Sequence, residues 1–141
     1  MPTMPDVKAI MTPNPATVGP DEPIRVAIDR MRERQCRRLP VVKDGRLVGI
    51  VSDRDLRRAT NSPLVLRERW YDEFLLDHIV VRACMTPNPA TIAPETPVVQ
   101  AAKLMRDRKI GGLPVVENER VVGIVTETDL LNYLIRSLEN Q

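Results

Sequence analysis

An α+β fold made of two βαββα repeats, packed about a pseudo-twofold axis and separated by a helical insertion, is the architecture that the sequence predicts. Residues 7–59 match residues 81–133 without a gap, at an offset of 74, with 26 identities in 53 positions. Each copy holds two apolar runs joined by a short polar turn, and stretches with apolar residues at helical spacing. A duplication of two units is too short for a solenoid, so both copies are expected to form one module.

The first half of each repeat reads as an extended piece followed by a helix. Residues 16–18 are extended after the turn-forming Pro13-Asn14-Pro15. Pro23 then opens a helix, and in the second repeat Thr96 is the expected N-cap before Pro97. The apolar positions at helical spacing are Ile24, Ala27, Ile28 and Met31 in the first copy and Val98, Ala101, Ala102 and Met105 in the second.

The second half of each repeat reads as a hairpin and a final helix. Residues 39–42 and 47–51 are apolar runs, and the Asp44-Gly45 between them is a strong hairpin signal. The final helix is expected to begin after Ser52, which can cap it, and to run through Asp55 and Leu56.

The domain boundaries follow from the repeats. We expect repeat 1 at residues 1–61, a helical insertion at 62–80 and repeat 2 at 81–141. The insertion is predicted to be an amphipathic helix that covers part of the pair, with docking of a partner as the alternative. Its apolar residues are Leu64, Leu66, Trp70, Phe74, Leu75 and Ile79.

Composition excludes several classes of function. Aromatic residues make up 3%, which disfavours stacking platforms for single-stranded nucleic acid, and the arginines of 30–38 are interrupted by acids, as on a solvated face. Two cysteines and one histidine supply neither a disulfide framework nor a metal site. No apolar run spans a bilayer and no signal-peptide core opens the chain, so we expect a cytoplasmic protein, or the cytoplasmic part of a larger one, without membrane insertion.

The candidate chemistry lies where each hairpin meets its final helix. In GIVSDRD (49–55) and GIVTETD (123–129), a hydroxyl residue ends the strand and an aspartate follows three residues later. A helix N-terminus favours a phosphate, a hydroxyl can donate to it, and a carboxylate can accept from two ribose hydroxyls. The same residues can equally form a helix cap. The glycine permits close approach of a ligand or a neighbouring backbone.

The ordered set of motifs resembles the CBS domain, and two in tandem resemble the CBS pair known as a Bateman module. The resemblance rests on MTPNPATV and MTPNPATI, on LPVV before each hairpin, and on GIVSDRDL and GIVTETDL, and it covers residues 4–135. It implies two clefts between the repeats that bind AMP, ADP, ATP or S-adenosylmethionine as a regulatory ligand, with no required cofactor, no metal and no catalytic residue.

The resemblance also implies which residues line each cleft. One cleft would use Met11, Asn14, Ala16, Cys36 and Arg37 for adenine, with Thr126, Thr128 and Asp129 for phosphate and ribose. The other would use Met85, Asn88, Ala90, Ile110 and Gly111, with Ser52, Arg54 and Asp55.

The two copies differ in charge where a phosphate would bind. Before LPVV the first repeat has Arg37-Arg38, while the second has Gly111-Gly112. Residues 7–59 carry a net charge of +5, and residues 81–133 carry none. We therefore expect the Asp55 cleft to hold a nucleotide phosphate, and the Asp129 cleft to bind more weakly or to prefer a less charged ligand.

The expected function is a sensor that passes ligand occupancy on as a change of shape or assembly. Asp53/Asp55 and Glu127/Asp129 are carboxylate pairs, but at i and i+2 on a helix they point apart, so we do not expect an enzyme. The expected partners are a second copy in a homodimer and an effector protein or fused domain, and no nucleic acid. The alternative is a dimerisation or docking scaffold without a physiological nucleotide, part of a larger transporter or enzyme.

Overall fold

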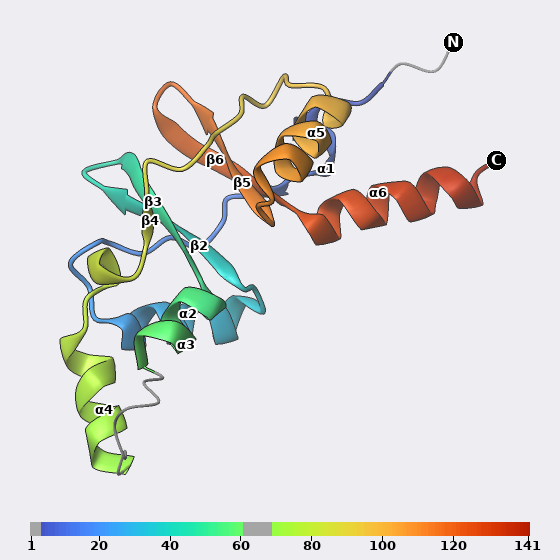
Figure 1. Cartoon of the computed structure of the whole chain (residues 1–141). Coiled ribbons are helices and arrows are strands. Elements are labelled where there is room, and N and C mark those ends of the chain that lie inside the picture. The colour runs from blue at the N-terminus through green and yellow to red at the C-terminus, as the bar shows by residue number, and fades with distance from the viewer. Residues whose placement is uncertain (1–3, 61–68) are drawn as a thin grey trace. The chain divides into compact units, whose positions relative to one another are not determined.

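The computed structural model describes residues 4–60 and 69–141, without the side chains of 69–72. The chain divides into two compact units, each with its own sheet and apolar core (Figure 1). Unit 1 comprises residues 1–15 and 90–141, and unit 2 comprises residues 16–89. Two mixed units of helices and three-stranded sheets confirm the α+β fold with two repeats.

Unit 2 is a sheet of order β2-β3-β4 with helices beside it. Its elements are α2 (Ile24–Arg34), β2 (Arg38–Lys43), β3 (Arg46–Ser52), α3 (Asp53–Thr60), α4 (Arg69–His78), the 3-10 turn η1 (Val81–Ala83) and β4 (Thr86–Pro87). Helix α2 buries Ile24, Ala27 and Met31 against strand residues such as Leu39 and Val51, so the predicted helical face is the core face.

Unit 1 repeats this plan with the sheet order β1-β6-β5. Its elements are α1 (Val7–Ile10), β1 (Thr12–Pro13), α5 (Val98–Arg108), β5 (Gly112–Glu117), β6 (Arg120–Thr126) and α6 (Glu127–Glu139). Its core joins Val7 and Ile10 of α1 to Val98, Ala101 and Met105 of α5. Helix α6 has no buried residue.

Both hairpins close through two residues with positive φ. Asp44 and Gly45 have φ of 52° and 79°, while Asn118 and Glu119 have φ of 52° and 66°. Two left-handed residues match the twist of antiparallel strands, which is why Asp-Gly predicts the first turn correctly. In the second turn Glu119 adopts a conformation that glycine takes more easily.

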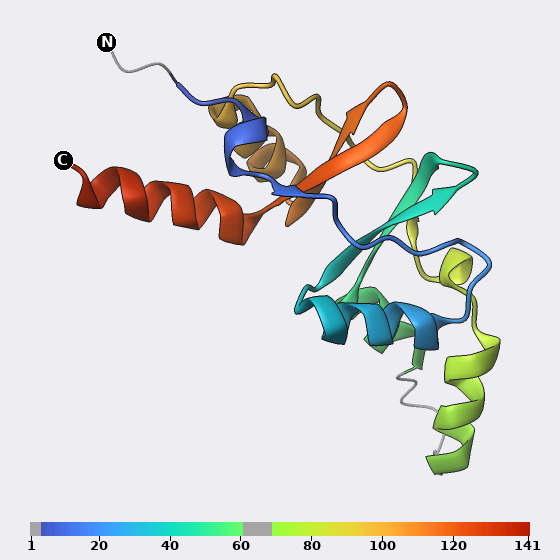
Figure 2. The same cartoon turned by 180° about the vertical axis from the view of Figure 1, so that it is seen from behind.

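The third strand of each sheet comes from the opening segment of the other repeat. Strand β1, from the first repeat, pairs with β6, and β4, from the second, pairs with β3. The blue N-terminal segment can be followed to β6 in Figure 2. The compact units therefore exchange the opening segments of the sequence repeats, an arrangement that the repeat pattern leaves open.

Gly49 and Gly123 allow these short strands to pair. A Cβ at Gly49 would lie 2.9 Å from the carbonyl oxygen of Thr86 and would also strike the sulfur of Met85. A Cβ at Gly123 would lie 3.1 Å from the carbonyl oxygen of Thr12 and would strike Met11. The prediction that these glycines permit close approach is confirmed for a neighbouring backbone.

One local prediction needs correction. Thr96 is not the N-cap of α5, because Pro97 takes that place and the Thr96 carbonyl instead accepts a hydrogen bond from the Val7 amide at 2.7 Å. There a long-range backbone contact overrides the local preference. The extended piece predicted at residues 16–18 makes an isolated parallel bridge, between Val18 and Val41, outside the named strands.

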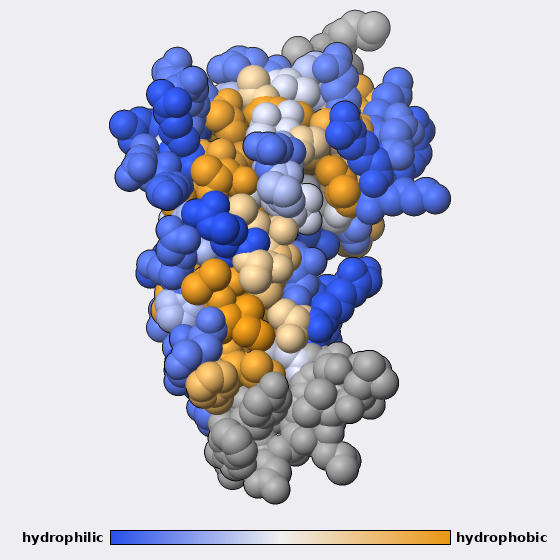
Figure 3. Space-filling model, turned by 60° about the vertical axis from the view of Figure 1, so that its left-hand side comes forward, coloured by the Kyte–Doolittle hydropathy of each residue, from blue (hydrophilic) through white to orange (hydrophobic). Residues whose placement is uncertain are grey.

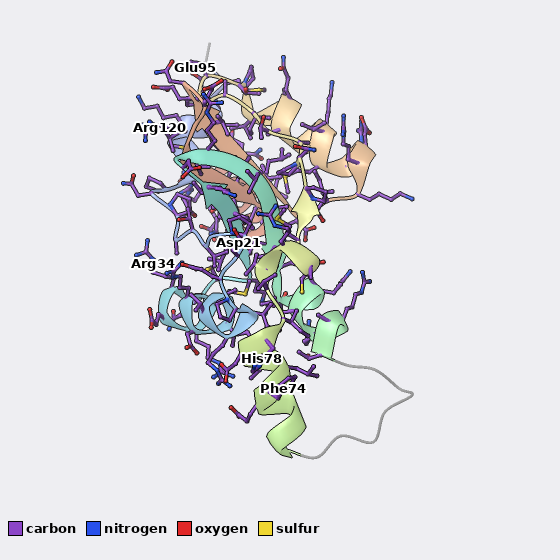
Figure 4. The ribbon with its side chains drawn as sticks, turned by 90° about the vertical axis from the view of Figure 1, so that its left-hand side faces the viewer. Asp21, Arg34, Phe74, His78, Glu95 and Arg120 are labelled. Carbon is purple, nitrogen blue, oxygen red and sulfur yellow. The ribbon has the colours of Figure 1, made fainter. Side chains whose placement is uncertain are left out.

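Helix α4 packs on α2 and α3, as predicted for the insertion. Leu76 and the following Ile79 pack against the unit 2 core, and the Ile24 amide donates to the Ile79 carbonyl at 2.9 Å. Phe74 and His78 stack on the outer side, with ring centroids 3.9 Å apart (Figure 4). Leu64 and Leu66 lie outside the described residues, as does the side chain of Trp70.

Candidate functional site

The strand-to-helix turn of each unit forms a reciprocal helix cap. In unit 2 the Ser52 amide donates to Asp55 Oδ2 at 2.8 Å, and the Asp55 amide donates to Ser52 Oγ at 3.1 Å. In unit 1 the Thr126 amide donates to Asp129 Oδ2 at 2.9 Å, and the Asp129 amide donates to Thr126 Oγ1 at 3.4 Å. The capping interpretation is therefore confirmed in both copies.

Capping does not use every polar atom of these residues. In the described part of the chain, neither Asp55 Oδ1 nor the Ser52 hydroxyl proton takes part in a recorded hydrogen bond. The Thr126 hydroxyl, by contrast, donates to Asp129 Oδ2 at 3.2 Å. Asp55 and Asp129 are both half-buried, so neither carboxylate is turned fully to solvent or sealed in the core. Unit 2 therefore keeps one acceptor and one donor available at this turn.

The exchanged opening segment reaches the same turn in each unit. Thr12 Oγ1 donates to Asp129 Oδ1 at 3.4 Å across a sequence separation of 117 residues. In unit 2, Cys84 lies close enough to Asp55 for the carboxylate to raise the pKa of the thiol, although burial is the larger cause. Sequence reasoning missed Thr12 and Cys84; the Thr common to both openings was the available signal for Thr12.

Arg37 and Arg38 lie at the unit 2 turn. Arg38 is the register partner of Ser52, and the Asp53 amide donates to the Arg37 carbonyl at 2.9 Å. In unit 1 the same positions are Gly112, paired with Thr126, and Gly111, whose carbonyl accepts from Glu127 at 3.1 Å. The charge difference found in the sequence is thus located beside the two caps.

The other predicted site residues divide between the units. Arg54 and Thr128 are exposed in the first turns of α3 and α6, one residue before the capping aspartates. Asn14 and Asn88 follow β1 and β4 with positive φ of 47° and 46°. Neither predicted set lies within one unit, because each unit holds part of both sets. The residues are Met11, Asn14, Ala90, Ile110, Gly111, Thr126, Thr128 and Asp129 in unit 1, and Ala16, Cys36, Arg37, Ser52, Arg54, Asp55, Met85 and Asn88 in unit 2.

Each predicted cleft therefore draws residues from both units, and its full composition stays a prediction. We refer to Ser52, Asp55, Arg38 and Met85 as the Asp55 half-site, and to Thr126, Asp129, Thr12 and Met11 as the Asp129 half-site. Within residues 4–60 and 69–141, no group of three or more His, Cys, Asp or Glu side chains is placed to hold a metal ion. No described helix has the length and apolarity needed to cross a membrane.

Comparison with known proteins identifies the repeats. The family model for the CBS domain matches residues 7–62 and 81–136. A CBS domain-containing protein of Dictyostelium discoideum is 46% identical over 137 residues, covering 94% of this chain and 93% of that protein.

Solved structures agree with this match. CBSX2 in complex with AMP superposes with a TM-score of 0.78 at 29% identity, covering 94% of this chain and 97% of that one. Another CBSX2 structure that matches is from Arabidopsis thaliana. The CBS domain pair of MJ0100, in complex with 5′-methylthioadenosine and S-adenosylmethionine, superposes with a TM-score of 0.80 at 28% identity, covering 96% of this chain and 99% of that one. The expectation that the chain is not an enzyme is confirmed by this set of relatives. The chain belongs to the CBS domain family and carries two such domains in tandem.

Proposed function

We propose that this CBS pair is a regulatory module that binds an adenosine derivative at its two capping aspartates. The observation that carries the proposal is the Asp55 half-site, where Asp55 Oδ1 and the Ser52 hydroxyl remain available beside Arg38. A carboxylate oxygen suits a ribose diol, and a hydroxyl donor with an arginine suits a phosphate. CBSX2 with AMP, and MJ0100 with S-adenosylmethionine, support this class of ligand.

The two half-sites are proposed to differ in the ligand they prefer. In the Asp129 half-site, Thr12 and Thr126 already donate to the carboxylate, and Gly111 and Gly112 replace the arginines. A phosphate there would lack a cationic partner from these positions. We therefore assign AMP, ADP or ATP to the Asp55 half-site, and a less charged adenosine derivative such as S-adenosylmethionine, or weaker binding, to the Asp129 half-site.

Signalling would follow from linkage between ligand and conformation. A ligand shifts the population of two arrangements only by its difference in affinity for them. We propose that the readout is a change of shape or assembly, in a homodimer or on an effector protein, and that the module works in the cytoplasm.

Arg38→Ala tests the proposal by calorimetric titration with AMP and with adenosine. A hydrogen bond from a charged group contributes about 1.5–3 kcal/mol, so AMP should bind roughly tenfold or more weakly. Adenosine, which has no phosphate, should keep its affinity. Arg46→Ala is the matched control. Arg46 begins β3 and Ser52 ends it, so the two residues are roughly 20 Å apart.

The outcomes separate the assignments. Unchanged AMP affinity in Arg38→Ala would remove the phosphate role of Arg38. An equal loss for adenosine and AMP would show that the variant disturbs the fold of the site. If the unaltered protein binds neither AMP, ATP nor S-adenosylmethionine, the sensor function itself is wrong.

A docking scaffold is the second candidate. Asp55 and Asp129 both have a structural role as helix caps, and α6 exposes an apolar face. Thermal unfolding distinguishes the two. A ligand at 100 times its dissociation constant adds about 2.7 kcal/mol to the free energy of unfolding, whereas a scaffold melts at the same temperature with AMP, ATP or S-adenosylmethionine.

A further inference from the structure

Helix α4 lies outside the sequence repeats and is only shallowly seated on unit 2. Among its described side chains, those of residues 73–78, none is fully buried, and Phe74 is 47% exposed. Mixed surfaces of this kind occur elsewhere on the protein, since the face drawn in Figure 3 shows apolar residues in separate patches among hydrophilic ones. The docking of α4 therefore depends on a small number of specific contacts.

Arg25 joins α4 to α2 through two carboxylates. Its Nε donates to Asp77 Oδ1 at 2.5 Å, and its Nη2 donates to Glu73 Oε2 at 2.6 Å. Glu73 and Asp77 are four residues apart, so one guanidinium group bridges successive turns of the helix. At the 74-residue offset, unit 1 has Val99 in the place of Arg25. This attachment is therefore particular to unit 2.

Helix α4 also packs on α3, the helix whose first turn holds Asp55. Helix α3 is eight residues long, and within Asp53–Thr60, all of which the structure describes, Leu56 is the single fully buried side chain. A helix shorter than about 12 residues is marginal by itself in water, so α3 depends on the helices packed against it. The corresponding α6 has 13 residues. Docked α4 thus supports the element that carries Asp55.

The segment that follows α4 carries Met85, another part of the Asp55 half-site. The Ile24 amide donates to the Ile79 carbonyl at 2.9 Å, next to Arg25 in the first turn of α2. Val81 is fully buried, and its carbonyl accepts from the Met85 amide at 2.9 Å. Residues 79–85 therefore connect the end of α4 to Met85 through short, buried contacts.

We infer that docking of α4 sets the ligand affinity of the Asp55 half-site, with Arg25 as a positioning residue that acts through α4. Helix α4 contacts α3, which carries Asp55, and continues into the segment that carries Met85. A ligand held by both residues favours the arrangement that docked α4 favours, so each stabilises the other. The inference rests on the proposed function and adds a control that unit 1, with Val99, does not share.

Calorimetric titration of the full chain with AMP tests the inference. Arg25→Val, which introduces the residue of unit 1, should weaken AMP binding at least about fivefold, the lower end of the usual range for coupled sites. Asp77→Asn should weaken it similarly, and the double variant should bind no more weakly than the single variants, because all three break the same contact. Arg106→Val is the matched control: Arg106 also pairs with an aspartate, Asp107, but both lie on α5 of unit 1, so AMP affinity should not change.

Amide hydrogen exchange supplies a readout that a purely structural role of Arg25 would not move. AMP should slow exchange in α4 of the unaltered chain, because linkage between two sites is reciprocal. Without ligand, Arg25→Val should accelerate exchange in α3 relative to β3. Circular dichroism checks that each variant is folded.

The results separate this inference from the sensor function. AMP affinity that is unchanged in the folded Arg25→Val and Asp77→Asn variants, additive losses in the double variant, or α4 exchange that AMP leaves unaltered would each overturn the inference alone. If the unaltered chain binds neither AMP nor another adenosine derivative, the proposed function is wrong and the inference falls with it.

Discussion

Gly49 and Gly123 are the positions at which one added carbon atom, the Cβ of an alanine, would displace the opening strand that pairs there. Gly49 pairs with Pro87 and Gly123 with Pro13, and the carbonyl oxygen of the threonine before each proline lies about 3 Å from the missing Cβ. A methionine sulfur can move aside, whereas a strand carbonyl is held by its pairing. The glycines therefore position Met85 and Met11, to which the resemblance to the CBS domain gives a role in the predicted adenine wall.

Gly49→Ala should lower the free energy of unfolding by about 1–3 kcal/mol, because overpacking displaces the Thr86 backbone. Gly123→Ala should cost less, since its nearest backbone oxygen is 3.1 Å away instead of 2.9 Å. Gly19→Ala is the control: a Cβ there meets only Glu22 side-chain atoms at 3.5 Å or more. Urea unfolding monitored by circular dichroism gives the three values, and equal stability of Gly49→Ala and Gly19→Ala would contradict the close-approach explanation.

Helix α4 is attached to unit 2 partly by charge, and this attachment has a defined pH range. The Arg25 hydrogen bond lowers the pKa of Asp77 below its ordinary value. A carboxyl group with a lowered folded-state pKa stabilises the folded state above its unfolded pKa, and this contribution is lost as the pH falls through the folded value. The ion pair is exposed, so the effect is local and salt-dependent.

Amide hydrogen exchange in α4 should therefore accelerate relative to α2 below about pH 4, the range set by ordinary aspartate values. Asp77→Asn should show the faster exchange already at pH 7 and little further change in acid. Asp107→Asn is the control, because Arg106 likewise lowers the pKa of Asp107 but the two residues are neighbours on one helix. If α4 and α2 respond alike to pH, the ion pair does not hold the helix.

Elements whose signals are local were predictable from sequence. Asp44-Gly45 predicted its hairpin because two left-handed residues favour that turn, and the Ile24–Met31 spacing predicted the buried face of α2. Strands β1 and β4 are two residues long and contain a proline, so no alternation of apolar and polar residues predicts them. Their partners were also undetermined, because Met-Thr-Pro-Asn-Pro-Ala-Thr is identical in both openings and suits either hairpin.

The candidate site was predictable in its caps but not in its surroundings. Ser52 with Asp55 and Thr126 with Asp129 are local patterns, and the hairpin register then places Arg38 opposite Ser52. The Thr12 contact to Asp129 joins residues 117 apart, and only the folded chain shows which opening reaches which aspartate.

At the scale of the whole molecule, the exchanged openings predict which fragments fold. Residues 16–89 contain the complete core and sheet of unit 2, so this fragment should fold alone. Residues 81–141 lack Val7, Ile10 and β1, and burial of two such side chains contributes about 3–6 kcal/mol. That is comparable with the total stability of a small domain, so this fragment should be unfolded.

Circular dichroism of the two fragments checks this prediction, and a synthetic peptide of residues 4–15 added to 81–141 should restore structure. A cooperatively folded 81–141 fragment without the peptide would show that the opening segment is dispensable to unit 1.

The exchange of opening strands between the two repeats has a consequence for the origin of the chain. In a single ancestral repeat, the edge strand of the hairpin would have had no opening strand to pair with. The opening segment of that repeat would likewise have had no hairpin partner. Two identical single-repeat chains, each giving its first strand to its companion, would have satisfied both. Gene fusion would then have turned an exchange between molecules into one within a molecule, leaving each copy free to acquire its own charges.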